Sequence, residues 1–432
     1  MKAAALILLL CIASTQNDWP LFRHNPEGNS YSGCQLPDTL DIVWKFSLPD
    51  GSSGKASRGF SGGVTPSVSD SKIYFVVDGV LHCLDADYGI LLFEKRISET
   101  EKYSTYTAVE GTRVFVCEDT YLYHDVLERE DYHLLCFDIS KKEVIWSVSP
   151  GFLTDSVPIA KNGRVYLPVF QDGIAWLWGR FGGYEWDTLV CIDSTGGILW
   201  QVSPSEPYIH VIIHAPPVLG DGKIYMVGDR LTYNDILYCL DAENGALLWK
   251  KGIHGYQAWV HYYDGAVYCG CSPRIAKIDG ENGDVIWEKE IEYSVENYFT
   301  IGDGKLFIEV DTDQFSEGCE EMWGLDASTG DRIWRSEILK CTGIPAAADG
   351  KVITGSFDGY IYLLDGENGD ILQKIYIGEK VCCPVIASGK VFVQTRYCMY
   401  ALGKKGHPYE VICVITFLCL LLTIRRRHSK QI

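Results

Sequence analysis

The chain has 432 residues, of which 57 are acidic and 38 are basic, so its formal net charge is -19. An acidic balance of this size argues against a nucleic-acid-binding protein, because such proteins present a basic surface to the phosphates. Hydrophobic residues make up 47% of the chain, which is enough material for a large packed core. Helical periodicity is nearly absent between the two ends, so the sequence predicts an all-β protein.

The first 16 residues have the pattern of a secretory signal. Lys2 precedes an apolar stretch that ends at Ala13, and small residues follow it. We therefore expect residues 1–16 to be a signal peptide and the rest of the chain to be exported.

A short phrase returns along the chain, and its clearest copy is LYCLDAENGALLW, which ends at Trp249. Related phrases end at Phe93, Trp146, Trp200, Trp287, Trp334 and Gln373. Units of roughly 40 to 50 residues that contain several strand-like pieces indicate a solenoid, a propeller or an array.

Each unit begins with two apolar runs around a tight turn, as in APPVLGDGKIYMVG, which starts at Ala215. Asp-Gly between such runs is a hairpin signal, so we expect four strands per unit, named A to D from the inside outward. The repeated phrase places an Asp where strand C enters a turn, and its carboxylate is expected to accept backbone N–H groups there. These aspartates are Asp85, Asp138, Asp193, Asp241, Asp279, Asp326 and Asp365.

The last residue of each phrase lies on the outermost strand, and a Trp at this place is expected to dock between neighbouring units. The outer positions are Trp44, Phe93, Trp146, Trp200, Trp249, Trp287, Trp334 and Gln373. Trp44 belongs to LDIVWKF, residues 40–46, which we expect to supply the missing outer strand of the last unit. The sequence therefore predicts an eight-bladed β-propeller of four-stranded antiparallel blades over residues 17–406, closed by the N-terminal strand and without an open sheet edge.

The Leu-x-x-Leu-Asp-x-x-x-Gly-x-x-x-Trp phrase resembles the repeat of the PQQ-like (pyrroloquinoline-quinone-like) β-propeller family. The segment DWPLFRHNPEGNSYS, residues 18–32, is similar to the start of such proteins after their signal peptide. The resemblance covers about residues 18–405 and implies a fold rather than one function, because the family holds both quinoprotein dehydrogenases and cofactor-free scaffolds. We expect the cofactor-free surface or scaffold type.

Sixteen cysteines in an exported chain suggest disulfides. Four of them share one slot, two residues before the repeat Asp in different units, and we interpret these as small buried hydrophobic residues. They are Cys83, Cys136, Cys191 and Cys239. Cys341 and the pair Cys382–Cys383 lie at the starts of adjacent inner strands, so a disulfide between them is the one bridge that the pattern suggests.

The dehydrogenases of the family stack their quinone on a vicinal disulfide and hold Ca²⁺ with carboxylate and amide oxygens. The pair Cys382–Cys383 matches the vicinal disulfide, so the alternative function is an oxidoreductase that binds PQQ and calcium near these thiols. The chain offers no readable calcium motif and no readable catalytic base, and residues 311–321 lack the third oxygen ligand of a calcium loop. We therefore expect no metal, no cofactor and no catalytic residues.

Insertions fall between strands B and C, at residues 118–132, 170–188, 228–236 and 311–321, and long loops also join strand D to the next strand A. All these connections open on one face of a propeller. Large aromatic residues among glycines suit a recognition surface, although packing of the aromatic side chains on one another explains them equally well. The predicted partner-binding residues are Trp176, Trp178, Arg180, Tyr184, Trp186, Tyr256 and Trp259.

The far end of the chain contains an apolar run at residues 409–424, followed by a basic tail at residues 425–432. As a helix its 14-residue apolar core covers about 21 Å, which arginine snorkelling and local thinning extend to a membrane span. We expect a C-terminal transmembrane helix with the tail in the cytoplasm and the propeller outside.

These patterns together predict a membrane-anchored, extracellular binding or scaffold module. A protein partner is the first expectation and a cell-surface glycan the second, because Trp and Tyr side chains also stack on sugar rings.

Overall fold

A computed structural model describes most of the region between the two ends of the chain. The described residues are 18–48, 65–97, 106–118, 133–151, 157–169, 188–203, 212–213, 215–229, 235–253, 258–271, 273–312, 319–381 and 383–405. Within these ranges the chain forms strands β1 to β33 and no helix. Consequently no helix of the described part is long and apolar enough to span a membrane. The predicted signal peptide and the predicted anchor at 409–424 lie outside the described residues.

The described strands form seven hydrogen-bonded sheets, and the first three are antiparallel and four-stranded. Their strands are β3 (Ser67–Ser69), β4 (Lys72–Val77), β5 (Val80–Asp85) and β6 (Leu91–Arg96); β7 (Thr107–Glu110), β8 (Arg113–Glu118), β9 (His133–Asp138) and β10 (Glu143–Val148); and β11 (Ile159–Lys161), β12 (Arg164–Val169), β13 (Thr188–Asp193) and β14 (Ile198–Val202).

The next two sheets have the same antiparallel order, with a divided inner strand in the first of them. Their strands are β15 (Ile212–Ile213), β16 (Val218–Gly220), β17 (Lys223–Asp229), β18 (Ile236–Asp241) and β19 (Leu247–Gly252); and β20 (Trp259–Tyr263), β21 (Ala266–Cys271), β22 (Arg274–Asp279) and β23 (Val285–Glu290).

The sixth sheet is eight-stranded, because β27 continues for 17 residues and pairs with β26 at its start and with β28 at its end. Its strands are β24 (Ser294–Gly302), β25 (Lys305–Asp311), β26 (Cys319–Asp326), β27 (Arg332–Ala348), β28 (Lys351–Ser356), β29 (Tyr360–Asp365) and β30 (Ile371–Tyr376), with β1 (Tyr31–Ser32) added in parallel to β27. The seventh sheet contains β31 (Val385–Ala387), β32 (Lys390–Gln394), β33 (Cys398–Gly403) and β2 (Asp41–Ser47).

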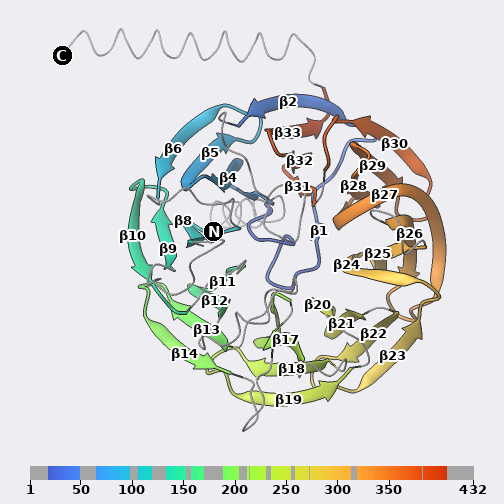
Figure 1. The fold of residues 1–432 in the computed structure, drawn as a ribbon, viewed down its shortest axis with the longest axis horizontal. Helices are drawn as coiled ribbons and strands as arrows, with labels where there is room; N and C mark the ends of the chain where they lie inside the picture. Colours follow the sequence, from blue (N-terminus) through green and yellow to red (C-terminus); the bar gives the residue numbers. More distant parts are fainter. Residues whose placement is uncertain are drawn as a thin grey trace, which may run out of the picture.

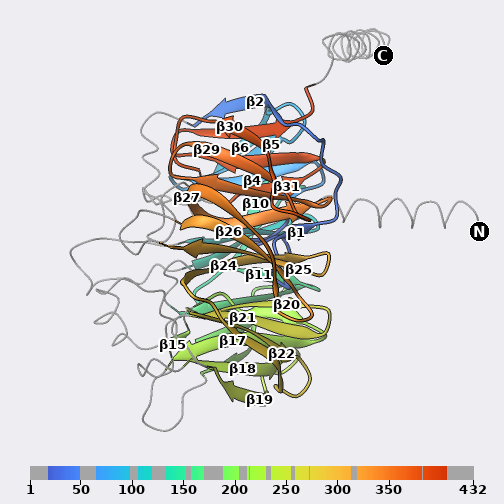
Figure 2. The same cartoon turned by 90° about the vertical axis from the view of Figure 1, so that its right-hand side faces the viewer.

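The sheets are arranged around a common centre as in a β-propeller, with strands such as β6, β10, β14 and β19 on the outer rim (Figure 1). Strand β2 pairs antiparallel with β33, so the N-terminal strand completes the last sheet as the sequence predicts. Figure 2 shows the ring from the side, with the blue N-terminal segment that leads to β2 along one face. The N-terminal strand β2 and the C-terminal strand β33 therefore close the ring.

Local sequence explains the strands and their turns. At the hairpin between β16 and β17, Asp221 and Gly222 have φ values of 47° and 74°, which is the left-handed pair that an Asp-Gly turn favours. The inner strand β4 is buried at all positions after its first, since it is covered on both faces by neighbouring sheets. The outer strand β19 alternates between exposed and partly buried residues because one edge of each sheet meets solvent.

The connections between strands divide the molecule into two faces. In an antiparallel meander the A–B and C–D turns lie at one end, and the B–C and D–A connections lie at the other. We call these the AB face and the BC face. The strand bounds place residues 119–132 between β8 and β9 and residues 170–187 between β12 and β13, so both insertions join strands B and C, as predicted.

Candidate functional site

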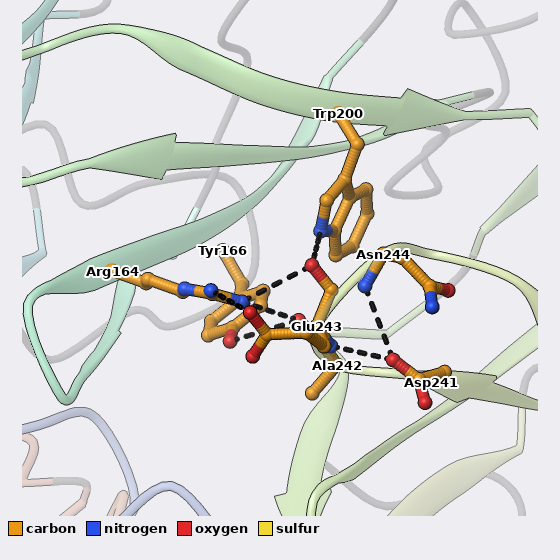
Figure 3. Close-up of polar contacts among 7 residues, drawn as sticks. All are labelled: Arg164, Tyr166, Trp200, Asp241, Ala242, Glu243 and Asn244. Carbon is orange, nitrogen blue, oxygen red and sulfur yellow. Dashed lines mark hydrogen bonds and ion pairs between the residues drawn. The ribbon is translucent and has the colours of Figure 1, made fainter.

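The repeated Trp and Asp residues form the junctions between neighbouring sheets (Figure 3). Trp200 on β14 donates a hydrogen bond of 3.1 Å from Nε1 to the carbonyl oxygen of Glu243, which lies in the turn after β18. The Asp241 carboxylate shapes that turn by accepting the backbone N–H groups of Glu243 and Asn244 at 2.8 and 3.1 Å. The Asp of one sheet thus builds the turn on which the Trp of the preceding sheet docks.

Two further side chains of the same sheet reach the turn from β12. Arg164 donates to the carbonyl oxygens of Ala242 and Glu243 at 3.2 Å each, and Tyr166 donates to that of Ala242 at 3.2 Å. Arg164 also forms an ion pair of 2.5 Å with the Glu243 carboxylate. Backbone carbonyls carry most of this junction, so it depends on turn shape more than on side-chain identity.

The same junction recurs around the ring. The indole donors and their carbonyl acceptors are Trp44 and Ala86, Trp146 and Ser194, Trp200 and Glu243, Trp249 and Gly280, Trp287 and Ala327, and Trp334 and Gly366. The carboxylates that accept turn N–H groups are those of Asp85, Asp138, Asp193, Asp241, Asp279, Asp326 and Asp365. These contacts give the repeat residues a structural role.

The N-terminal segment, residues 18–32, lies in the centre of the ring (Figure 1). Its backbone forms hydrogen bonds of 2.7 to 3.1 Å with inner strands of five of the described sheets. The pairs are Trp19 with Val68, Pro20 with Val109, Pro26 with Leu219, Glu27 with Tyr262, Asn29 with Ile301 and Ser30 with Ala347. All six strands donate an N–H to the segment close to their A–B turns, so the segment lies in the centre near the AB face.

Phe22 points from this segment into a buried apolar cluster on its BC side. The cluster consists of Phe22, Tyr106, Val157, Ala215, Trp259, Ile344 and Cys383, and each is 7% exposed or less. Apart from Phe22 and from Ile344, which lies within β27, these residues lie at the first residue of an inner strand or up to three residues before it. The centre of the propeller is therefore filled by packing from the protein's own N-terminal segment.

Arg23 is buried in the same place, with 3% of its surface exposed. Its guanidinium donates to the carbonyl oxygens of Val260 and Pro216 at 2.9 and 3.3 Å and lies 5.3 Å from the ring centre of Trp259. Trp259 is 4% exposed. The structure thus corrects the prediction that Trp259 lies on the recognition surface, because its indole is a packing partner of Arg23.

His261 adds a neutral polar group to the centre. Its side chain is fully buried, Nδ1 lies 2.5 Å from the carbonyl oxygen of Gly28, and its ring centre is 3.8 Å from that of Phe299. A carbonyl only accepts, so Nδ1 carries the proton. Burial lowers the pKa of His261 well below its usual value, and the positive charge of Arg23 lowers it further. This histidine is thus a neutral donor at physiological pH.

Six of the predicted partner-binding residues lie outside the described part of the chain. They are Trp176, Trp178, Arg180, Tyr184, Trp186 and Tyr256. Recognition by these residues therefore stays a prediction.

The thiols predicted to form a bridge have separate positions. Cys341 is a free, buried thiol that donates to the carbonyl oxygen of Cys319 at 3.2 Å, so no bridge from Cys341 to the Cys382–Cys383 pair is formed. Cys382 lies outside the described residues, and Cys383 has a φ of 48° within the apolar cluster around Phe22. A planar cofactor bound beside Cys383 would therefore contact the buried apolar cluster that contains Phe22.

Sequence patterns did not reveal the central position of residues 18–32. These residues contact partners between 49 and more than 300 positions away, and no local period in the sequence indicates contacts over such separations. The available signal is that the closing strand β2 precedes the first sheet in the chain, so the N-terminal segment has to pass the ring before β2 reaches its outer edge.

The family model for outer membrane protein assembly factor BamB, a PQQ-like repeat model, matches residues 37–177, 182–297 and 318–407. The chain belongs to this PQQ-like β-propeller family. A relative described as outer membrane protein assembly factor BamB, from Yersinia pestis, is 21% identical over 339 residues, which cover 74% of this chain and 78% of the relative.

Solved structures agree with the fold. The crystal structure of BamB from Moraxella catarrhalis has a TM-score of 0.59 at 13% identity and covers 85% of this chain and 100% of its own. A quinohemoprotein alcohol dehydrogenase from Pseudomonas putida HK5 has a TM-score of 0.65 at 13% identity and covers 92% of this chain and 83% of its own. Identities this low show a shared fold, and both binding proteins and enzymes use that fold.

Proposed function

We propose that this protein is an exported, non-catalytic binding or scaffold module that recognises a protein partner through its BC face. The observation that carries the proposal is the filled centre. Phe22, Arg23 and Trp259 pack together where a propeller could otherwise hold a ligand, and the backbone of residues 18–32 covers the AB side. The BC face, which carries the long insertions, is then the surface left for recognition. Relatives named as assembly factors support a protein partner.

We infer that the ring has eight blades. Strand β27 pairs with β26 up to Cys341 and with β28 from Cys341 onward, so the eight-stranded sheet divides there into two units of four strands. The eight outer positions from Trp44 to Gln373 agree with this division. Residues 17–406 would then form the complete propeller, preceded by the signal peptide at 1–16.

Anchoring to a membrane through residues 409–424 is part of the same proposal. Strand β33 ends at Gly403, beside the start of β2 at Asp41, on the AB face. A short tether from this point would hold the AB face toward the membrane and direct the BC face away from it, toward partners. The basic residues 425–432 favour a cytoplasmic tail.

Site-specific photo-crosslinking in cells tests the recognition face. A photo-reactive residue at Trp176 or at Trp186 should give a discrete protein adduct, and one at Glu281 or Glu367, which lie in C–D turns of the AB face, should not. Equal adduct yields from both faces, or no adduct at Trp176 and Trp186, would contradict the proposal that the BC face is the recognition surface. An adduct made of carbohydrate would replace the protein partner with a cell-surface glycan.

The alternative is a quinoprotein-type oxidoreductase with PQQ and calcium near Cys382 and Cys383. The fold similarity to a quinohemoprotein alcohol dehydrogenase favours it. Native mass spectrometry of the purified protein with PQQ and Ca²⁺ decides between the two functions. A retained quinone mass that is lost in Cys383→Ala would establish the oxidoreductase, and no retained mass would leave the binding module.

A further inference from the structure

Three buried side chains with metal-binding atoms meet where β25, β26 and β27 lie side by side. Glu309 on β25, Cys319 at the start of β26 and Cys341 in β27 are each 0% exposed. One carboxylate oxygen and the two sulfur atoms all lie within 4.8 Å of one another. Within the described ranges this is the one group of three or more such side chains that is compact enough to hold a metal ion.

The backbone fixes this arrangement. Cys319 and Cys341 are directly paired residues of neighbouring antiparallel strands, so their side chains share one side of the sheet. The Cys341 thiol donates to the carbonyl oxygen of Cys319 at 3.2 Å. Thr354 on β28 donates to Oε1 of Glu309 at 2.6 Å, which orients the carboxylate as an outer contact orients a metal ligand.

The charges around the thiols favour a cation. Glu309 places a buried carboxylate beside the two sulfur atoms, and a bound cation would balance its negative charge and stabilise both thiolates together with it.

We propose that Glu309, Cys319 and Cys341 form a binding site for Zn²⁺. Two thiolates and one carboxylate match a borderline-soft ion, whereas Ca²⁺ and Mg²⁺ require oxygen ligands. With Zn–S bonds of about 2.3 Å, tetrahedral ligands stand about 3.8 Å apart, so the three donor atoms need to close by no more than about 1 Å. A water molecule or a further side chain would complete the fourth position.

Binding exchanges protons for the metal. Zn²⁺ displaces one proton from each thiol, so two protons leave as the ion enters, and the carboxylate contributes its charge unchanged. The site would lie where the two halves of the eight-stranded sheet meet, because Cys341 is the residue at which β27 passes from its pairing with β26 to its pairing with β28. The site lies at the BC end of this sheet, because Cys319 begins β26 directly after a B–C connection, but none of its three ligands is among the residues predicted to bind a partner.

Metal analysis of the full chain, purified under reducing conditions and loaded with Zn²⁺, tests the proposal. The wild type and Cys239→Ala should each retain about one Zn²⁺ per chain, whereas Cys341→Ala should retain almost none. Cys239 is the matched control because it is an equally buried thiol in another sheet. Glu309→Gln keeps the shape of the side chain and should weaken binding by about tenfold or more.

A second measurement needs no variant. Titration of the wild type with Co²⁺ should give thiolate-to-metal charge-transfer absorption in the near ultraviolet, with release of two protons per ion. Absence of both Zn²⁺ retention and this absorption would overturn the proposal. So would peptide mapping that finds a Cys319–Cys341 disulfide in the protein isolated from its own compartment.

Discussion

The side-chain amide of Gln373 forms two hydrogen bonds with the backbone of Leu40, one in each direction and both 2.8 Å long. Gln373 occupies the outer-strand position at which most other sheets have a docking Trp. The last sheet takes its outer strand β2 from the N-terminus, so no C–D turn follows β33 to receive an indole. The amide instead holds the residue that precedes β2, which makes Gln373 the docking residue of the ring closure.

Replacing Gln373 with Leu should lower the free energy of unfolding by about 1 to 3 kcal/mol, because a backbone N–H and a carbonyl oxygen of Leu40 lose their partner. Urea denaturation followed by fluorescence measures the change. Gln201→Leu is the control, since Gln201 lies on an outer strand but is exposed, and it should change stability by less than about 0.5 kcal/mol. Equal effects of the two substitutions would argue against a closing role for Gln373.

Gly283 tests the docking of Trp249. Gly283 and Gly265 both have a φ of 76°, so Ala at either position meets the same backbone strain of about 1 kcal/mol. A Cβ atom at Gly283 would lie 2.8 Å from the Trp249 ring, whereas one at Gly265 would have nothing within 4 Å. Gly283→Ala should therefore cost about 1 to 3 kcal/mol more than Gly265→Ala in the same denaturation experiment. A difference near zero would show that the indole moves aside without loss.

Phe93 and Lys142 replace the Trp and the Gly of the repeat at one junction. The Lys142 ammonium lies 5.2 Å from the Phe93 ring centre, and Lys142 has a φ of 57°. A larger ring at position 93 would meet the Cβ atom that the other junctions lack. Phe93→Trp alone should thus destabilise the protein by about 1 to 3 kcal/mol. Adding Lys142→Gly should restore stability, with a coupling energy of about 1 kcal/mol or more in a double-mutant cycle. If the effects of the two substitutions on stability are additive, the residues at positions 93 and 142 are not coupled, and this interpretation of the junction is wrong.

Local signals predicted the fold well because the repeat is made of short-range chemistry. The Asp–Gly–Trp phrase encodes a turn within five residues, and Asp241 together with Trp200 shows how each turn also forms a junction. The order of the sheets then follows from the chain order. The junctions at Phe93 and Gln373 looked like losses of the docking residue, but each has its own partner, Lys142 and Leu40.

The repeat pattern could not predict contacts between residues that are far apart in the sequence. Arg23 contacts Val260, 237 positions away, and the Glu309, Cys319 and Cys341 cluster gathers atoms from three strands. No residue spacing in the sequence indicates either the Arg23 contact or this cluster. Trp259 was assigned to a surface because it is aromatic and near a loop, yet its neighbours in space, Phe22 and Arg23, come from the other end of the chain.

The four cysteines that lie two residues before a repeat Asp should not react with alkylating reagents in the folded protein. Cys83, Cys136, Cys191 and Cys239 are each 0% exposed, and burial is the main cause that raises their pKa to about 11 for Cys83 and about 12 for the other three. Little thiolate is then present at pH 8. Iodoacetamide at pH 8 should leave these four unmodified in native protein and alkylate them in urea, as read by peptide mass spectrometry. Native alkylation of any of them would contradict its buried position.

His261 should make the protein less stable as the pH falls below about 6.5, the usual value for histidine. Burial and Arg23 lower its pKa in the folded protein, so the unfolded chain takes up a proton that the folded chain does not. The contribution of neutral His261 to the free energy of unfolding is fully present above the pKa that this histidine has in the unfolded chain. It is lost as the pH falls toward the lower pKa of the folded protein. His261→Asn keeps a donor for the Gly28 carbonyl and cannot titrate. Between pH 7.5 and 5 the wild type should therefore lose about 1 to 2 kcal/mol more stability than the variant. His24 and His82, whose pKa values burial also lowers, remain in both proteins, so parallel curves would show that His261 does not carry the effect.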